Sequence, residues 1–487
     1  MSYQSFPEDL RDFFFFLVGI KGTGMAALAE ILLARGARVE GCDVEERFYT
    51  DEILEDLRIK VFTGFDASLL PAGTNGVVFS SAYSPHTQEV LREARDRGLP
   101  LWEYTEALGA LSEKTPAAGV AGVHGKTTTT GIAGSLVKAL GLPYTVLAGS
   151  AVADFGNRST LIQGEEGLIA ETCEYRRHFL RFHPDVILLT SVEADHLDYF
   201  SGYDDILDAF VEYVRGLPPG GKLIYCASQD GAVETAERLR KERSDLEFIP
   251  YGFNAPGAYG IEAVRREEGE QFFRLPCWAG EFCLRIPGRH TVENAAGALA
   301  LVAVMTEKTL GRPLGAQDWE TLAGGIRAFR GSRRRSEILG EAGGILFMDD
   351  YAHHPSAIRT TLKGLKEFYP RRRLVVDFMS HTYSRTAGLF DEFSESFGDA
   401  DLVILHKIYG SARENQGEGE TVSGEKLYQA VRKLHPRVYY TGEPAEAEPL
   451  CREILKPGDL FLTMGAGNNW TLGRRLYEEG KLRENNL

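Results

Sequence analysis

The chain has 487 residues, of which 43% are hydrophobic and 25% are charged, as in an ordinary soluble globular protein. At roughly 150 residues per domain, this length predicts about three domains, each long enough to bury its own core. The formal net charge of −16 argues against nucleic acid as a partner, because an acidic surface repels a polyanion. A local basic pocket could still hold a small phosphorylated ligand.

The apolar run Phe13–Ile20 is too short to cross a bilayer, and it follows acidic residues instead of the basic lead-in of a signal peptide. We therefore expect no membrane insertion. The six cysteines include no C-x-x-C pair, which favours reduced thiols over a disulfide framework or a zinc site. Reduced thiols are typical of a cytoplasmic protein.

The first segment, residues 1–114, alternates strand-like and helix-like runs, which indicates a parallel sheet in a Rossmann-like domain. In chain order we expect a strand at 13–20, a helix at 22–35, and strands at 37–41, 76–80 and 101–104.

The turn after the first strand fits the G-x-G-x-x-A form of the dinucleotide fingerprint. Its glycines let backbone N–H groups approach a diphosphate at a helix N-terminus. Asp43 follows about 20 residues later, where an acid can contact a ribose. A nicotinamide cofactor and simple tight packing are alternatives, but the diphosphate of any nucleotide-linked sugar meets the same demands. The candidate contacts are Gly22, Thr23, Gly24, Met25, Asp43 and Ser80.

The second segment, residues 115–332, opens with a strand at 117–123 that runs into Gly-Val-His-Gly-Lys-Thr-Thr, followed by a helix from Thr127 to about Leu140. This is a phosphate loop: backbone N–H groups cradle phosphate oxygens, Lys126 neutralises them and Thr127 can ligate Mg²⁺. Its first glycine is nearer to the lysine than in the general motif. We expect a central P-loop ATPase domain with a mainly parallel sheet, and nucleotide contacts from Gly122, His124, Gly125, Lys126, Thr127 and Thr128.

Candidate partners for Mg²⁺ follow two later strands. Glu171 and Glu174 come after the apolar segment 168–170, and His196 comes after the strand expected at 185–191. Residues past the carboxyl ends of parallel strands share one rim with the phosphate loop. Because Mg²⁺ prefers oxygen ligands, a purely structural role for His196 stays open, as does the choice between the two glutamates.

The third segment, residues 333–487, again has the pattern of a Rossmann-like domain, with strands expected at 344–348, 374–378, 402–405 and 460–463. Polar side chains follow the first two of these strands. An arginine there could hold a carboxylate bidentately. These candidates are Asp350, Tyr351, His353, His381 and Arg385.

Three arginines, Arg333 to Arg335, lie at the second boundary. They are either a solvated surface run or a source of cations for a transferring phosphate, which an ATPase requires.

Taken together, these motifs resemble the Mur ligases, and the match spans nearly the whole chain. The matching segments are 16–25, 122–130, 173–179, 349–355, 381–386 and 410–415. The chain departs from the family pattern at Thr291, at Met379-Ser380 and within 465–470, and the modified lysine of some branches is absent between His196 and Lys222.

The resemblance implies three α/β domains: a UDP-sugar-binding domain (1–114), an ATP-binding domain (115–332) and an amino-acid-binding domain (333–487). It implies catalytic roles for Lys126, His196, Arg334 and His353. It also implies that Thr127, Glu171 and His196 hold Mg²⁺. The adenine and ATP contacts would be Asn294, Arg334 and Asp350, and the amino-acid site would be Tyr351, His353, His381 and Arg385.

The implied reaction joins L-alanine to UDP-N-acetylmuramate for peptidoglycan synthesis, with ATP and Mg²⁺, through an acyl phosphate. The implied enzyme is cytoplasmic and a monomer or homodimer. Three alternatives stand beside it: a family branch that attaches a whole tripeptide during recycling, an NAD-dependent dehydrogenase, and a protein that senses the nucleotide without turnover. The dehydrogenase leaves the phosphate loop unexplained.

Overall fold

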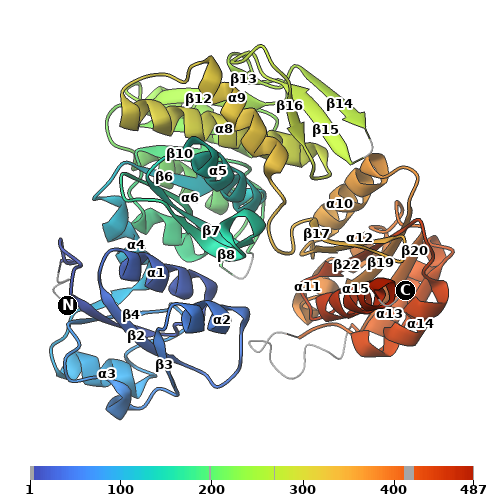
Figure 1. Cartoon of the computed structure of the whole chain (residues 1–487), viewed down its shortest axis with the longest axis horizontal. Coiled ribbons are helices and arrows are strands. Elements are labelled where there is room, and N and C mark those ends of the chain that lie inside the picture. The colour runs from blue at the N-terminus through green and yellow to red at the C-terminus, as the bar shows by residue number, and fades with distance from the viewer. Residues whose placement is uncertain (1–4, 197–198, 268, 411–421, 486–487) are drawn as a thin grey trace. The chain divides into compact units, whose positions relative to one another are not determined.

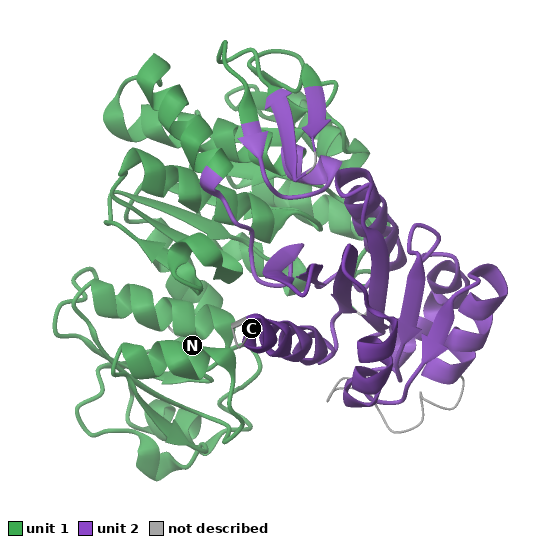
Figure 2. Cartoon of the chain, turned by 45° about the vertical axis from the view of Figure 1, so that its right-hand side comes forward, with its two compact units in different colours: residues 1–263, 274–282, 293–327 green, residues 264–273, 283–292, 328–487 purple. Residues whose placement is uncertain are grey.

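The computed structural model describes residues 5–196, 199–267, 269–410 and 422–485. The chain divides into two compact units, shown in Figure 2. Unit 1 comprises residues 1–263, 274–282 and 293–327, and unit 2 comprises residues 264–273, 283–292 and 328–487. Residues 411–415 of the last matching motif lie outside the described residues.

The N-terminal part of unit 1 contains a five-stranded sheet in the order β3-β2-β1-β4-β5, and all of its strand pairs are parallel (Figure 1). The strand β1 is buried along its whole length, because its Phe and Val side chains meet helices on both faces. The expected Rossmann-like organisation is confirmed. The elements are β1 (Phe14–Val18), α1 (Thr23–Ala34), β2 (Arg38–Asp43), α2 (Tyr49–Asp56), β3 (Lys60–Thr63), β4 (Gly76–Phe79), α3 (Glu89–Asp96), β5 (Leu101–Glu103) and α4 (Tyr104–Ser112).

The rest of unit 1 is built on an eight-stranded sheet in the order β13-β12-β11-β10-β6-β9-β7-β8. The sheet is mainly parallel, as expected, but β7 and β8 pair antiparallel. Its strands are β6 (Ala117–Ala121), β7 (Tyr144–Val152), β8 (Arg158–Ile162), β9 (Gly167–Glu171), β10 (Val186–Leu189), β11 (Lys222–Cys226), β12 (Glu247–Gly252) and β13 (Tyr259–Gly260). The helices of this region are α5 (Lys126–Leu140), α6 (Tyr203–Arg215), α7 (Asp230–Glu242), α8 (Arg289–Leu310) and α9 (Ala316–Ala328).

Unit 2 has a six-stranded sheet in the order β17-β18-β22-β19-β20-β21, parallel except for β17 against β18. Its elements are β17 (Glu337–Ala342), β18 (Ile345–Asp350), α10 (Pro355–Phe368), β19 (Arg373–Met379), α11 (Tyr383–Gly388), α12 (Phe390–Ser394), β20 (Leu402–Leu405), α13 (Gly424–Leu434), β21 (Val438–Tyr440), α14 (Glu448–Ile454), β22 (Asp459–Gly465) and α15 (Trp470–Asn485). A small sheet of β14 (Ala263–Glu267), β15 (Glu270–Arg274) and β16 (Phe282–Leu284) precedes them.

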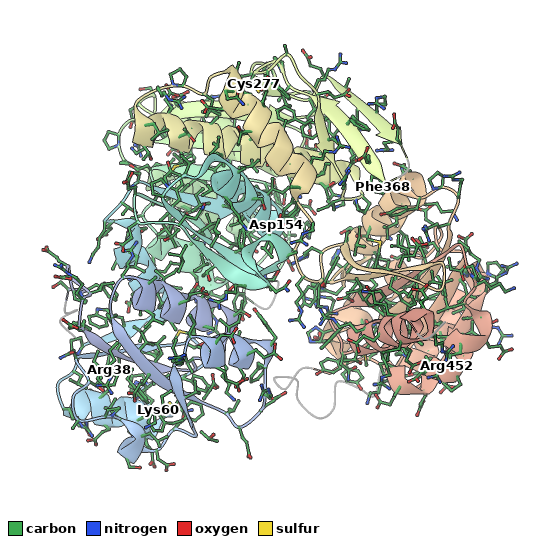
Figure 3. All side chains as sticks on the ribbon, in the orientation of Figure 1. Arg38, Lys60, Asp154, Cys277, Phe368 and Arg452 are labelled. Carbon is green, nitrogen blue, oxygen red and sulfur yellow. The ribbon has the colours of Figure 1, made fainter. Side chains whose placement is uncertain are left out.

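Both faces of the six-stranded sheet are buried. Along β19, Val375 packs into one apolar cluster, whereas Val376 and Phe378 pack into another with Phe368 of α10, which is labelled in Figure 3. Burial on both faces explains why the strand is a nearly continuous apolar run, as parallel sheets require. In the described part of the chain, no helix has the length and hydropathy to cross a membrane.

Candidate active site

The predicted nucleotide turn joins β1 to α1. Gly22 is the N-cap of α1, and a Cβ on Gly24 would lie 2.8 Å from the ring of Tyr104, so this position requires glycine. Thr23 accepts a hydrogen bond of 2.9 Å from the hydroxyl of Tyr49. The side chain of Met25 is buried in the core, which leaves only its backbone for a ligand.

Asp43 shapes this turn. Its carboxylate accepts hydrogen bonds from the backbone N–H groups of Lys21 (2.7 Å) and Val44 (2.8 Å) and from the hydroxyl of Tyr83 (3.3 Å). The side chain is buried, and burial together with the Asp43 charge raises the pKa of Tyr83 to about 12. Asp43 therefore orders the backbone that would face a diphosphate. Its direct contact with a ribose stays a prediction, as does any contact from Ser80, whose N–H bonds the carbonyl of Val18.

The backbone of the phosphate loop requires glycine at two positions. Gly122 has φ +133°, and a Cβ there would lie 2.1 Å from Oγ1 of Thr190. Gly125 has φ +82° and begins α5, and a Cβ there would lie 2.7 Å from Oδ1 of Asn294. The predicted adenine contact Asn294 thus packs directly against the loop. Thr128 lies on the first turn of α5.

Lys126 is engaged by a carboxylate at the loop. Its Nζ lies 2.8 Å from Oε2 of Glu174 and also donates to the carbonyl of Gly122. Burial is the largest single influence on the pKa of Lys126 and lowers it, but the charges of Glu174, Cys173 and Glu171 and the hydrogen bond with Glu174 together outweigh burial, so the pKa is raised. Burial is likewise the largest influence on the pKa of Glu174 and raises it, but the charge of Lys126 and the hydrogen bonds with His196 and Lys126 together outweigh burial, so the pKa is lowered. Both groups are therefore charged.

The candidate metal ligands lie on the same rim. Oγ1 of Thr127 donates to Oε1 of Glu171 (3.0 Å), whose other oxygen accepts from the N–H of Gly149 (2.6 Å). His196 is instead next to Glu174, with 3.6 Å between Nε2 and Oε1. The hydrogen bond with Glu174 is the main reason that the pKa of His196 is raised.

Among the described residues, no three His, Cys, Asp or Glu side chains gather closely enough to hold a metal by themselves. Two adjacent hard oxygens, from Thr127 and Glu171, fit Mg²⁺, which keeps several waters and takes its remaining ligands from phosphates.

Within unit 1, one cavity of about 160 Å³ is lined both by the nucleotide turn and by the candidate metal ligand Glu171. Its walls include Thr23 and Gly24 of the turn as well as Gly149 and Glu171. A neighbouring cavity of about 410 Å³ shares Thr105 and His178 with it. Its basic walls are Arg176, Arg177, His178 and Arg181. The structure therefore brings the first two predicted sites together.

The remaining phosphate-loop residue, His124, is exposed, and its Nε2 lies 3.6 Å from Glu193. Its backbone N–H donates to Oγ of Ser191 (2.9 Å), which ties the loop to the end of β10.

Arg334, in unit 2, is fixed by two contacts. Its Nε donates to Oδ2 of Asp349 (3.0 Å) and its Nη2 to the carbonyl of Gly465 (2.5 Å). Arg334 also has a left-handed φ of +58°, a costly conformation that is common at functional sites. Burial raises the pKa of Asp349 to about 6, although Arg334 opposes the shift.

Asp350 and its neighbours form the loop after β18. Asp350 is buried and accepts hydrogen bonds from Ser336 (N–H, 2.6 Å) and from the N–H of Ala352 (2.8 Å). The ring of Tyr351 faces the Arg334 guanidinium at 5.1 Å, and Nδ1 of His353 lies 2.9 Å from the Tyr351 carbonyl.

His381 and Arg385 lie after β19. The guanidinium of Arg385 donates to the carbonyl of His381 (2.9 Å), and the ring of His381 lies 5.9 Å from that of Tyr409. These two residues and the loop after β18 lie at the carboxyl ends of strands in one sheet, where α/β domains bind ligands.

Sequence reasoning did not point to Tyr104 and Gly149, which line the cavity of unit 1. Tyr104 and Gly149 reach the site through the packing of distant segments, which a local pattern does not reveal.

Comparison with known proteins covers the chain in three consecutive parts. Residues 16–115 match the model of the Mur ligase family catalytic domain, residues 120–302 the Mur ligase middle domain, and residues 334–467 the Mur ligase glutamate ligase domain. The curated relatives include the UDP-N-acetylmuramate–L-alanine ligase of Treponema pallidum, which is 49% identical over 478 residues, covering 98% of each chain. The enzyme of the same name from Borrelia garinii is 37% identical over 470 residues, covering 96% of this chain and 98% of the relative.

Among solved structures, the UDP-N-acetylmuramate–alanine ligase of Thermotoga maritima superposes with a TM-score of 0.77 at 23% identity, over 96% of this chain and 99% of that one. A murein peptide ligase from Psychrobacter arcticus gives a TM-score of 0.63 at 22% identity, over 95% and 98%. These two likenesses show the shared three-domain fold. Since the three family models and the curated relatives extend over nearly all of its length, the chain belongs to the Mur ligase family.

Proposed function

We propose that this chain uses ATP to join L-alanine to the lactyl carboxylate of UDP-N-acetylmuramate in peptidoglycan synthesis. The observation that carries the proposal is the cavity of unit 1 whose walls include both Thr23 and Gly24 of the nucleotide turn and Glu171 beside the phosphate loop. A sugar nucleotide with its diphosphate on the turn would extend through this cavity toward the phosphate loop. The names of the curated relatives support the acceptor.

ATP is required because a carboxylate does not react with an amine at neutral pH, since the leaving group would be oxide. In the proposed reaction a carboxylate oxygen attacks the γ-phosphorus of ATP, the bond to ADP breaks, and an acyl phosphate forms. The amine of alanine then attacks the acyl carbon. The carbon–oxygen bond to phosphate breaks, inorganic phosphate leaves, and the amine loses its proton as the amide forms.

The residues of the phosphate loop would bind and position the ATP phosphates. Lys126 would exchange the carboxylate of Glu174 for phosphate oxygens, a like-for-like change of anionic partner. Mg²⁺, held by Thr127 and Glu171 with His196 nearby, would supply positive charge that offsets the negative charge of the transferring phosphate. Asn294, packed on Gly125, would face the adenine side of the loop.

The residues of unit 2 would supply the acceptor site. Arg385 would bind the carboxylate of alanine, since a guanidinium forms paired hydrogen bonds with a carboxylate. His381, Tyr351 and His353 would surround the amino acid. Arg334, oriented by Asp349 and Gly465, would act on the transferring phosphate, with Asp350 holding the loop beside it.

We further propose a cytoplasmic location and a monomer or homodimer. All six cysteines are free thiols, as expected in a reducing compartment, and the reaction consumes ATP. Light scattering of the purified chain measures the oligomeric state.

The test is phosphate release from ATP and Mg²⁺ with UDP-N-acetylmuramate, with L-alanine, glycine, L-serine or the stem tripeptide added in parallel. We expect L-alanine to drive release and to yield a product heavier by one alanine residue. Release with the tripeptide alone would place the chain in the recycling branch. No release with any acceptor would reject the proposal.

A further inference from the structure

A buried charged network crosses three adjacent strands of the six-stranded sheet in unit 2. Asp377 lies in β19, His406 directly follows β20, and Asn469 lies between β22 and α15. Asp377 and Asn469 are 0% exposed and His406 is 2% exposed. None of the three has a role in the reaction proposed above.

Asp377 is the hub of the network. Its Oδ2 lies 2.7 Å from Nε2 of His406, which must donate because a carboxylate only accepts. Its Oδ1 accepts from Nδ2 of Asn469 (2.9 Å). On the other side of the imidazole, Nδ1 lies 3.0 Å from Oγ1 of Thr441.

Stability alone does not explain this arrangement. The neighbours of Asp377 in β19 are apolar, and apolar packing in place of a buried ion pair is often neutral or stabilising. Within the described residues, Oδ1 of Asn469 is buried without a hydrogen-bond partner, which adds a desolvation cost. Burial is the largest single influence on the pKa of His406 and lowers it, but the charge of Asp377 and the hydrogen bonds with Asp377 and Thr441 together outweigh burial, so the pKa is raised.

The network is hydrogen-bonded to two segments: residues 379–385, which carry the predicted acceptor residues His381 and Arg385, and residues 464–469, which pack against them. Two backbone hydrogen bonds hold the first segment. The N–H of His406 donates to the carbonyl of Phe378 (3.3 Å), and the N–H of Tyr409 donates to the carbonyl of Ser380 (2.8 Å), one residue before His381.

In the second segment, Nδ2 of Asn469 also donates to the carbonyl of Met464 (3.1 Å). The next carbonyl, that of Gly465, accepts from Arg334. A Cβ on Gly465 would lie 2.2 Å from the carbonyl of Met379, so the two segments touch through their backbones.

We propose that Asp377, His406 and Asn469 are positioning residues that fix segments 379–385 and 464–469, and through them His381 and Arg385, for binding of the acceptor amino acid. The three residues touch no substrate. The inference rests on the proposed function, because that function assigns the acceptor amino acid to a site that includes His381 and Arg385.

The test compares Asp377→Ala with Asp377→Asn and with a matched control, Asp459→Ala. Asp459 is also a buried acid of this sheet, but it pairs with Arg373 at the amino ends of the strands. We expect Asp377→Ala to raise the KM for L-alanine about tenfold to a hundredfold, the range for loss of precise orientation, with the KM values for ATP and the sugar nucleotide within about twofold. Asparagine keeps the shape and can bond a neutral His406, so Asp377→Asn should recover most of the loss.

Asn469→Ala, which removes only the amide, should reproduce the alanine-specific change if Asp377→Ala does not fold. Equal changes in all three KM values, or the same profile in Asp459→Ala, would mean a merely structural network and overturn the inference. An unchanged KM for L-alanine in folded Asn469→Ala would overturn it as well. A wild-type chain that releases no phosphate with L-alanine would instead refute the proposed function.

Discussion

The ammonium of Lys126 lies 2.8 Å from a carboxylate oxygen of Glu174, at the loop where the phosphates of ATP are proposed to bind. The pair is almost fully enclosed, with 12% and 2% of the two side chains exposed. Glu174 also lies 3.6 Å from His196. A single buried anion therefore keeps the lysine charged and aimed into the loop before nucleotide arrives.

Lys126→Ala should reduce ligation at least about a thousandfold, because it removes a cation aimed at the transferring phosphate. The chain should remain folded and bind the sugar nucleotide as before, since the nucleotide turn is a separate part of unit 1. Phosphate release and calorimetric binding measure the two effects. Lys138→Ala is the control, because Lys138 lies at the far end of the same helix, where its Nζ donates to the Asp154 carbonyl. Lost sugar-nucleotide binding in folded Lys126→Ala would contradict this division of labour.

Glu171→Gln and Glu174→Gln should differ in their metal dependence. Glu171 shares a hydrogen bond with Thr127, so its loss should raise the Mg²⁺ concentration for half-maximal activity by about tenfold or more. Glu174 holds Lys126 and His196, so its loss should lower kcat with a smaller change in the Mg²⁺ requirement. Titration of activity with Mg²⁺ at saturating ATP measures this. The opposite pattern would identify Glu174 as the ligand.

Gly122→Ala should destabilise unit 1 by about 3 kcal/mol, through overpacking against Thr190 and a left-handed backbone that alanine disfavours. It should also abolish ATP binding. Gly141→Ala is the matched control, because Gly141 has φ +64° but open space around it. It should cost only about 1 kcal/mol, the penalty for a left-handed backbone at an L-residue. Denaturant unfolding and ATP calorimetry distinguish the two, and similar losses in both variants would show that backbone strain alone matters.

Asp349 should make the stability of unit 2 depend on pH. Its pKa is raised from the ordinary 3.8 to about 6, so the native state favours the protonated form. The contribution of Asp349 to the free energy of unfolding is complete below about pH 4 and is lost as the pH rises through about 6. Relative to Asp349→Asn, the wild-type chain should lose about 3 kcal/mol across that window. Guanidinium unfolding followed by Trp470 fluorescence, in chains whose other tryptophans are replaced by phenylalanine, measures the difference. A gain of wild-type stability with rising pH would contradict the shift.

The phosphate loop and the nucleotide turn could be predicted because each follows a short apolar run and precedes a helix. The meeting of Thr127 with Glu171 also followed from a simple rule, since the carboxyl ends of parallel strands share one edge. The antiparallel pairings of β8 and β17 had no such rule behind them, and the domain boundaries stay predictions.

Side-chain roles were less predictable than positions. The spacing located Asp43 correctly at the end of β2. It could not show that the Asp43 carboxylate already accepts hydrogen bonds from backbone N–H groups. Asn469 stood out in the sequence only as a departure from the family pattern. Its partner Asp377 is 92 residues away, and only the sheet order brings the two together.

The most direct test of the account follows the oxygen atoms of the lactyl carboxylate. UDP-N-acetylmuramate labelled with heavy oxygen at that carboxylate would be incubated with the chain, ATP, Mg²⁺ and L-alanine, and the released phosphate would be analysed by mass spectrometry. We expect one labelled oxygen in each phosphate released and one in each amide formed. Unlabelled phosphate together with an alanine-ligated product would contradict activation of the carboxylate by ATP.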